Sequence, residues 1–223
     1  LTPLQNTTPS TVDLQHILSD LKEQQHRLVA MEVSSHGLVQ HRVDQCHFKA
    51  AVFTNLSRDH LDYHGDMDSY GDAKLMLFRD FDAANVILNQ DDGQAEQWIE
   101  KYSFSKLICY GRKNLAPKNA QFVYFSDVSY SATGISAQLT TSWGDIAIKS
   151  PLYGEFNLYN LTAALATLLA LGYPLTQLVA GCEYLQPVAG RMQAFTAPNM
   201  PTCVVDYAHT PDALALALQA LQQ

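Results

Sequence analysis

The sequence predicts an α/β fold: a mostly parallel sheet with flanking helices, plus a small antiparallel sheet. Over the first 111 residues, short apolar and β-branched runs alternate with segments of helical periodicity, which is the pattern of a parallel sheet. Between residues 121 and 149, polar and apolar residues alternate around Thr133-Gly134 and Trp143-Gly144, which is typical of antiparallel hairpins. A hydrophobic content of 47% over 223 residues is sufficient for a buried core.

The first part of the chain is expected to alternate helices and strands. Ser10-Thr-Val-Asp13 resembles a capping box with Asp in place of Glu and opens an amphipathic helix. Asp68 is a possible N-cap of the next helix. After the first helix, the predicted elements are strands 27–33 and 50–54, helix 68–81, strand 85–89, helix 92–101 and strand 106–110.

The second part is expected to hold the antiparallel strands and then helices. The predicted strands are 121–130, 135–142 and 145–149, followed by helices 157–171 and 176–184. Residues 187–191 resemble a linker, and strand 202–206 with helix 211–222 resembles the opening βα unit of another domain. We therefore expect one domain over residues 1–188 and the start of a second over 189–223.

Composition excludes several classes of protein. A net charge of -8 argues against a nucleic-acid surface, and no apolar run approaches the ~20 residues of a membrane span. The four cysteines are far apart and form no CxxC, which favours a reduced, cytoplasmic protein. The first residues lack both a signal-peptide pattern and an initiator Met, so we expect a fragment.

Polar, metal-capable side chains follow two predicted strands. In open α/β sheets, ligands bind beyond the carboxyl ends of the strands. Because Mg²⁺ needs few protein oxygens, one or two carboxylates plus substrate phosphates would suffice. The acidic residues could equally be turn formers and helix caps. The residues concerned are Glu32, Ser34, Ser35 and His36 after the first strand, and Asn55, Asp59, His60, Asp62 and His64 after the second.

Lys74 lies inside a predicted helix, where a solvated surface lysine is the ordinary interpretation. The alternative is an amine whose pKa is lowered by burial, which can take up CO₂ and become a metal-binding carbamate. Asn157 and Asn160 lie one turn apart and could read a purine edge, or simply cap the helix. Asp206 could bind ribose hydroxyls or belong to a turn before Pro211.

Taken together, the motifs resemble the Mur ligase family of ATP-dependent peptidoglycan synthetases. The resemblance covers nearly the whole chain, in the family's order and spacing. It implies an acid–amino-acid ligase of cell-wall synthesis that adds meso-diaminopimelate to UDP-MurNAc-L-Ala-D-Glu through an acyl phosphate, and a monomeric parent protein. The matching segments are Asn6-Thr-Thr8, residues 31–43, 54–65 and 154–160, Gly190-Arg-Met192, and residues 206–212.

The resemblance also implies residue roles. Glu32 and His60 would bind Mg²⁺, and a carbamate on Lys74 would hold a second metal ion that an ammonium would repel. ATP would be bound by Asn157, Arg191 and Asp206. The UDP-MurNAc-dipeptide would be held by Asn6, Thr7, Thr8, Ser34, Gln40 and Arg42.

The sequence departs from the family at three points. Phe156 stands where many members have His, and the 223 residues contain no GxxxxGK[ST] phosphate loop, which in the family lies upstream of Asn6. The family's C-terminal domain, which selects the incoming amino acid, would lie beyond Gln223. We therefore expect the chain by itself to be inactive and, with apolar surface or a strand edge exposed, marginally stable or self-associating.

Three alternatives stay open. A folylpolyglutamate synthetase-like ligase is disfavoured by Asn6-Thr-Thr8 and by the pair Gln40 and Arg42, and UDP-sugar binding would decide. A nucleotide- or UDP-sugar-binding module without catalysis is favoured by the missing phosphate loop. A metal-dependent hydrolase built on Ser34 or Ser35 lacks a GxSxG elbow, and a phosphatase assay would test it.

Overall fold

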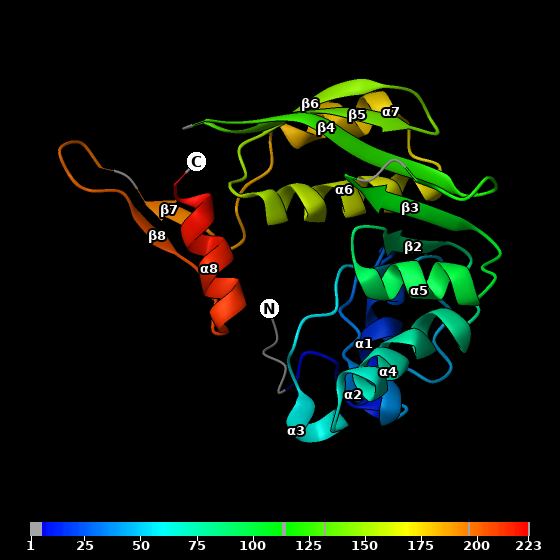
Figure 1. The fold of residues 1–223 in the computed structure, drawn as a ribbon. Helices are drawn as coiled ribbons and strands as arrows, with labels where there is room; N and C mark the ends of the chain where they lie inside the picture. Colours follow the sequence, from blue (N-terminus) through cyan, green and yellow to red (C-terminus); the bar gives the residue numbers. More distant parts are fainter. Residues whose placement is uncertain (1–5, 113–114, 132, 196, 223) are drawn as a thin grey trace. The chain divides into compact units, whose positions relative to one another are not determined.

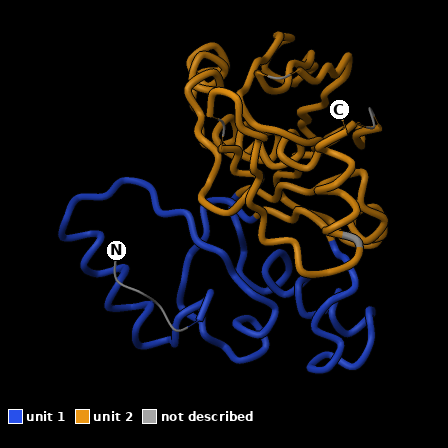
Figure 2. The backbone as a smooth tube through the Cα atoms, turned by 90° about the vertical axis from the view of Figure 1, so that its left-hand side faces the viewer, with its two compact units in different colours: residues 1–51, 56–84 blue, residues 52–55, 85–223 orange. Residues whose placement is uncertain are grey.

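The computed structural model describes residues 6–112, 115–131, 133–195 and 197–222. The chain forms two compact units (Figure 2): residues 1–51 with 56–84, and residues 52–55 with 85–223. The predicted domain boundary between residues 188 and 189 stays a prediction. The α/β fold expected from the sequence is confirmed.

The first unit is helical (Figure 1). It contains α1 (Thr11–Glu23), α2 (Ser35–Val39), α3 (Leu61–His64) and α4 (Met67–Arg79), and α4 packs against α2 and α3. Its core holds Leu14, Leu38 and Val43, which are at most 3% exposed and pack against partly buried apolar side chains of α4. Of the apolar side chains predicted to share one side of the first helix, Leu14 and Leu18 face this core, whereas Val12 is 66% exposed.

Both long helices of this unit begin at side-chain caps. The Ser10 hydroxyl accepts a hydrogen bond from the Asp13 amide, which confirms the predicted start of α1. At α4 the predicted cap was wrong by two residues: Asp66, not Asp68, has the extended backbone of an N-cap, and its Oδ1 accepts from the Ser69 amide at 2.7 Å. Asp68 lies in the first helical turn, where a negative charge still favours the helix dipole.

The predicted strand over residues 27–33 is wrong. This segment has no regular secondary structure and no ladder partner in the described part of the chain, and Leu28 and Val29 are 52% and 43% exposed. A strand needs a hydrogen-bonded neighbour, and composition alone does not supply one. The short helices α2 and α3 were not predicted, because their polar motifs resemble turns.

The main sheet of the second unit has six strands within the described residues, in the order β1 to β6 (Figure 1). β2 and β4 each pair with β3 in parallel, whereas β4, β5 and β6 pair antiparallel. The predicted antiparallel strands thus exist, but they continue the main sheet instead of forming a separate one. The strands are β1 (Ala51–Phe53), β2 (Val86–Asn89), β3 (Leu107–Gly111), β4 (Gln121–Ser131), β5 (Gly134–Thr141) and β6 (Ile146–Ser150).

Helices cover this sheet. α6 (Glu155–Ala170) packs against β2, β3 and β4, and α7 (Leu175–Cys182) packs against β6 and α6 (Figure 1). α5 (Gly93–Lys101) places the Trp98 ring 4.6 Å from the Phe53 ring of β1. Because β2 is buried along its whole length, its apolar run follows from burial on both faces.

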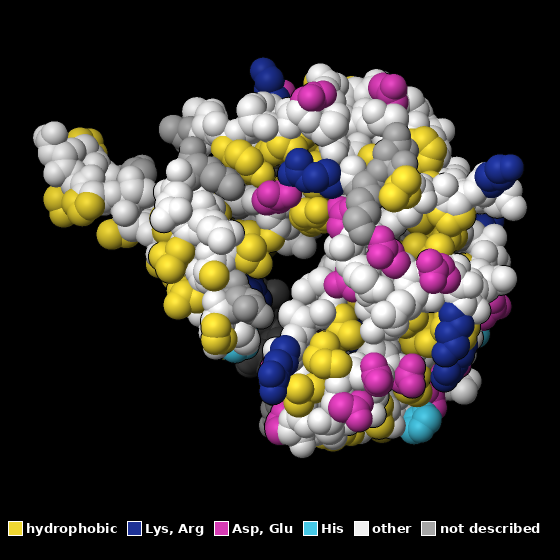
Figure 3. All heavy atoms as spheres, viewed as in Figure 1, with side chains coloured by type: hydrophobic (Ala, Val, Ile, Leu, Met, Phe, Trp, Pro, Cys, Tyr) yellow, Lys and Arg dark blue, Asp and Glu magenta, His cyan; other side chains and the backbone are white. Residues whose placement is uncertain are grey.

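A hairpin and a helix end the described chain. β7 (Gln193–Phe195) pairs antiparallel with β8 (Cys203–Val205), and α8 (Pro211–Ala220) begins at the Thr210 cap with Pro211 in its first turn. β7 was not predicted. Leu214, Leu216 and Leu218 of α8 are each more than half exposed, and Figure 3 shows apolar side chains gathered at this surface.

Candidate functional site

Thr8, one of the residues expected to bind the UDP-sugar peptide, is fully buried. Its hydroxyl donates to the Glu32 carbonyl at 3.1 Å and accepts from the Ser34 amide at 2.9 Å. A β-carbon on Gly37 would lie 2.9 Å from the Thr8 methyl group, so this position requires glycine. Thr8 therefore fixes the segment that carries Glu32 and Ser34, while Asn6 and Thr7 beside it are exposed.

The other expected substrate residues lie together in the first unit. Arg42 donates from Nη1 to the Thr8 carbonyl at 2.9 Å and from Nη2 to the Gln40 side chain. Gln40 donates in turn to the Tyr63 hydroxyl at 3.3 Å. Ser34 is the N-cap of α2 and accepts from the Gly37 amide at 3.0 Å. Tyr63 joins this network, although the sequence pattern assigned it no role.

A cluster of aromatic rings surrounds His60. The His36 ring lies 5.1 Å from the His60 ring and 4.0 Å from the Tyr63 ring. His64 accepts or donates a 2.9 Å hydrogen bond with the buried Ser35 hydroxyl, and its ring stacks on Tyr70 at 4.9 Å. The pKa values of His36 and His64 are lowered mainly by burial, and the charges of neighbouring histidines lower them further.

Lys74 points its amine into the same cluster. The Lys74 Nζ lies 4.9 Å from the centre of the Tyr70 ring. Burial lowers the pKa of the Lys74 ammonium, and the charges of Glu32 and Asp59 oppose that shift. Lys74 is therefore a partly buried amine near two carboxylates, which contradicts the ordinary interpretation as a solvated helix lysine.

His60 has a left-handed backbone, with φ of 54°, and is the cap residue of α3. Its amide donates to Asp59 Oδ1 at 2.8 Å, and its ring Nε2 lies 3.7 Å from Asp59 Oδ2. No three His, Cys, Asp or Glu side chains of the described residues meet as a metal site. Glu32 offers the carboxylate oxygen that Mg²⁺ prefers as a ligand, and a bound Mg²⁺ keeps several waters, so it needs few protein ligands.

The residues expected to bind ATP lie in the second unit. Asn157, in the first turn of α6, donates from Nδ2 to the Tyr153 carbonyl at 2.8 Å, so it is not the cap of the helix. Asp206 accepts from the Met192 and Ala208 amides at 2.9 and 2.8 Å, which closes the turn after β8. In the described part of the chain, no hydrogen bond or ion pair joins Asn157 to Asp206 or to the exposed Arg191.

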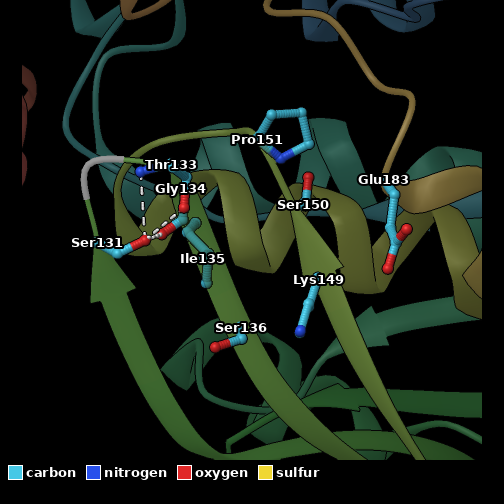
Figure 4. A pocket seen from close by; sticks show the side chains of 9 residues that line it. All are labelled: Ser131, Thr133, Gly134, Ile135, Ser136, Lys149, Ser150, Pro151 and Glu183. Atoms are coloured by element: carbon cyan, nitrogen blue, oxygen red, sulfur yellow. Dashed lines mark hydrogen bonds between the residues drawn. The ribbon is translucent and has the colours of Figure 1, made fainter.

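An open cavity of about 370 Å³ lies beside the end of β4, the start of β5 and the end of β6 (Figure 4). Four of its nine lining residues carry hydroxyl groups, and Lys149 and Glu183 are its charged side chains. None of the residues expected to bind substrate, metal or ATP lines it. It is therefore not part of the site predicted from the sequence.

None of the described helices is long and apolar enough to cross a membrane.

Comparison with known proteins places the chain in a family. Residues 2–168 match the model of the Mur ligase middle domain. The solved structure of a UDP-N-acetylmuramoyl-L-alanyl-D-glutamate--2,6-diaminopimelate ligase is 37% identical, with a TM-score of 0.81 over 96% of this chain.

Other ligases share the fold at lower identity. MurF from Acinetobacter baumannii is 25% identical, with a TM-score of 0.65 over 78% of this chain and 38% of its own. MurF from Thermotoga maritima in complex with ADP is 19% identical, with a TM-score of 0.68 over 83% of this chain and 42% of its own. The chain covers 43% of the diaminopimelate ligase, less than half of its length. The chain belongs to the Mur ligase family.

Proposed function

We propose that this chain is the central part of an ATP-dependent ligase that joins meso-diaminopimelate to UDP-MurNAc-L-Ala-D-Glu. The observation that carries the proposal is the 37% identity, over 96% of this chain, to a ligase named for that reaction. The Arg42 guanidinium supports it: it bonds the Gln40 side chain and the Thr8 backbone carbonyl, and a guanidinium and an amide held together suit an anionic, hydrogen-bonding sugar nucleotide.

The proposed reaction has two steps. A carboxylate oxygen of the D-glutamate attacks the γ-phosphorus of ATP, the bond to the β-phosphate oxygen breaks, and ADP leaves. The amine of diaminopimelate then attacks the acyl carbon, phosphate leaves and the nitrogen loses a proton. Phosphoryl transfer depends mostly on positioning and on stabilisation of charge. Arg42 and Ser34 would hold the acceptor, and Asn157, Arg191 and Asp206 would hold ATP.

The metal-binding part of the proposal rests on Glu32, His60 and Lys74. Mg²⁺, when bound, would neutralise charge that develops on the phosphates. A carbamate on Lys74 would turn a cation into an oxygen ligand, and the burial of this amine among Glu32, Asp59 and Tyr70 supports that role. ¹³C NMR of the chain in ¹³C-bicarbonate should show one carbamate signal that disappears in Lys74→Met and persists in the Lys149→Met control.

Binding of the sugar nucleotide tests the substrate assignment on the 223-residue chain. Calorimetry with UDP-MurNAc-L-Ala-D-Glu should give saturable binding that Arg42→Ala weakens at least tenfold, which corresponds to the loss of about 1.4 kcal/mol. Arg58→Ala is the control. Equal affinity of wild type and Arg42→Ala would contradict the assignment, and no binding by the wild type would contradict the proposed substrate.

A nucleotide- or UDP-sugar-binding module without catalysis is the second candidate. The observation that favours it is the absence of GxxxxGK[ST] from the 223 residues. We therefore propose that this chain alone does not ligate, although the ligase that it resembles does. ADP release by the isolated chain that depends on both UDP-MurNAc-L-Ala-D-Glu and diaminopimelate would overturn this.

A further inference from the structure

The carboxyl ends of β2 and β3 lie where open α/β sheets usually bind ligands, yet in this chain their polar side chains bind each other. Asp91 follows β2, and Arg112 follows β3. Asp91 Oδ2 accepts hydrogen bonds from the Tyr159 hydroxyl at 2.6 Å and from the Arg112 amide at 2.5 Å. One carboxylate thus ties two strand ends to α6.

A second set of contacts closes a ring of side chains. The Arg112 guanidinium donates to Glu155 Oε1 at 2.6 Å and lies 5.2 Å from the centre of the Phe125 ring. The Phe125 and Tyr159 rings meet edge to face at 4.9 Å. Asp91, Arg112, Phe125 and Tyr159 therefore form a closed set of contacts around the start of α6, and Glu155 extends it to the first residue of the helix.

Gly111 makes this set possible. Its φ is +141°, and a β-carbon there would lie 2.5 Å from Asp91 Oδ2 and 3.3 Å from Asn89 Oδ1. Any side chain at this position would displace the carboxylate that receives the Tyr159 hydroxyl. The close approach of Asp91 to the end of β3 is thus built into the backbone.

The ring of contacts holds the turn of α6 that carries Asn157. Glu155 is the first helical residue and Tyr159 the fifth, so Asn157 lies between two anchored positions. Gly154, the N-cap residue, has no side chain to cap the helix, and therefore these tertiary bonds hold the first turn in place of a cap. Burial and the bond to Asp91 raise the pKa of Tyr159, which keeps its hydroxyl a donor.

Stability alone does not account for the ion pair. The Arg112 and Glu155 side chains are 50% and 41% exposed, and ion pairs this open contribute about 0–1 kcal/mol. The first two turns of α6 carry Asn157, whose Nδ2 donates to the Tyr153 carbonyl and whose Oδ1 is its acceptor, and the exposed Asn160.

We propose that Asp91, Arg112 and Tyr159 are positioning residues that set nucleotide affinity and the preference for adenine by orienting the first turn of α6. This rests on the proposed function, in which Asn157 binds ATP. A purine is recognised by amide groups only when donor and acceptor meet the base edge in the right order. A small rotation of the first turn therefore reduces discrimination between bases as well as affinity.

The test measures dissociation constants of ADP and GDP for the 223-residue chain by calorimetry. Tyr159→Phe keeps the ring contact with Phe125 and removes only the hydroxyl, and Asp91→Asn keeps the shape and weakens the acceptor. We expect each to raise the ADP dissociation constant about tenfold and to lower the preference for ADP over GDP. Tyr130→Phe is the matched control, since the Tyr130 hydroxyl reaches Glu155 Oε2 only at 3.5 Å.

The outcomes separate this inference from the function on which it rests. Unchanged ADP affinity and base preference in Tyr159→Phe and Asp91→Asn, with ADP bound by the wild type, would overturn the positioning role alone. Equal loss of ADP and GDP binding together with a lower unfolding temperature would also overturn it, because that pattern reports a structural role. No ADP binding by the wild-type chain would overturn both the inference and the ATP assignment.

Discussion

Replacing Thr8 with valine removes a hydroxyl from a fully buried position without changing the shape of the side chain. In the structure this hydroxyl donates to the Glu32 carbonyl and accepts from the Ser34 amide. Each lost hydrogen bond costs about 0.5–1.5 kcal/mol, and a buried amide without an acceptor costs about 1–3 kcal/mol. We therefore expect Thr8→Val to lower the free energy of unfolding by about 2–4 kcal/mol.

Urea unfolding of the chain, followed by circular dichroism, measures this effect. With a slope of about 2 kcal/mol per molar urea, the midpoint should fall by about 1–2 M. The exposed neighbour Thr7 is the matched control, and Thr7→Val should stay within about 0.5 kcal/mol of wild type. If Thr8→Val unfolds at the wild-type midpoint, or Thr7→Val is equally destabilised, then the buried hydroxyl does not hold the Glu32 segment.

Three further predictions concern charge, thiols and exposed apolar surface. Burial lowers the pKa of Lys74 below its usual 10.5, so the unfolded chain binds more protons and stability should rise with pH. In CO₂-free buffer, where the amine carries no carbamate, Lys74→Met should accordingly stabilise the chain near pH 7 and lose that gain towards pH 10.5, as urea titrations at both pH values would show. Burial raises the pKa of the Cys109 thiol to about 12, so Ellman's reagent at pH 8 should modify the exposed Cys203 and spare Cys109 until urea unfolds the chain. Because Leu214 and Leu218 are more than half exposed, the chain should self-associate, and the double replacement by glutamate should shift it towards monomer in light scattering after gel filtration; a wild-type monomer would contradict this.

Local signals account for most of the predicted elements. Ser10 and Thr210 cap α1 and α8, as their position before an apolar run indicates. The apolar run of β2 and the alternation of β5 each match the observed burial. Prediction was wrong where a strand required a partner, as in residues 27–33, and where two aspartates competed for one cap, as at α4. Such outcomes depend on hydrogen bonds that a local pattern does not contain.

In the candidate site too, the sequence pattern predicted individual residues but not the contacts between distant ones. Motif spacing predicted metal-binding roles for Glu32, His60 and Lys74 and substrate-binding roles for Gln40 and Arg42, and these roles stay predictions. It assigned no role to Tyr63, whose hydroxyl lies 23 residues from its partner Gln40.

The sequence by itself determined most of the longer helices and strands, since periodicity and caps act over a few residues. It also determined the family, because the order of chemical groups along the chain is a sequence property. Only the tertiary structure decided that the Thr8 hydroxyl makes both of its hydrogen bonds within the protein and that Lys74 is partly buried. Only the tertiary structure joined Asp91 to Tyr159, 68 residues further along the chain. Contacts between distant residues arise when elements pack, and burial then sets whether a polar group is free to act or is already bonded.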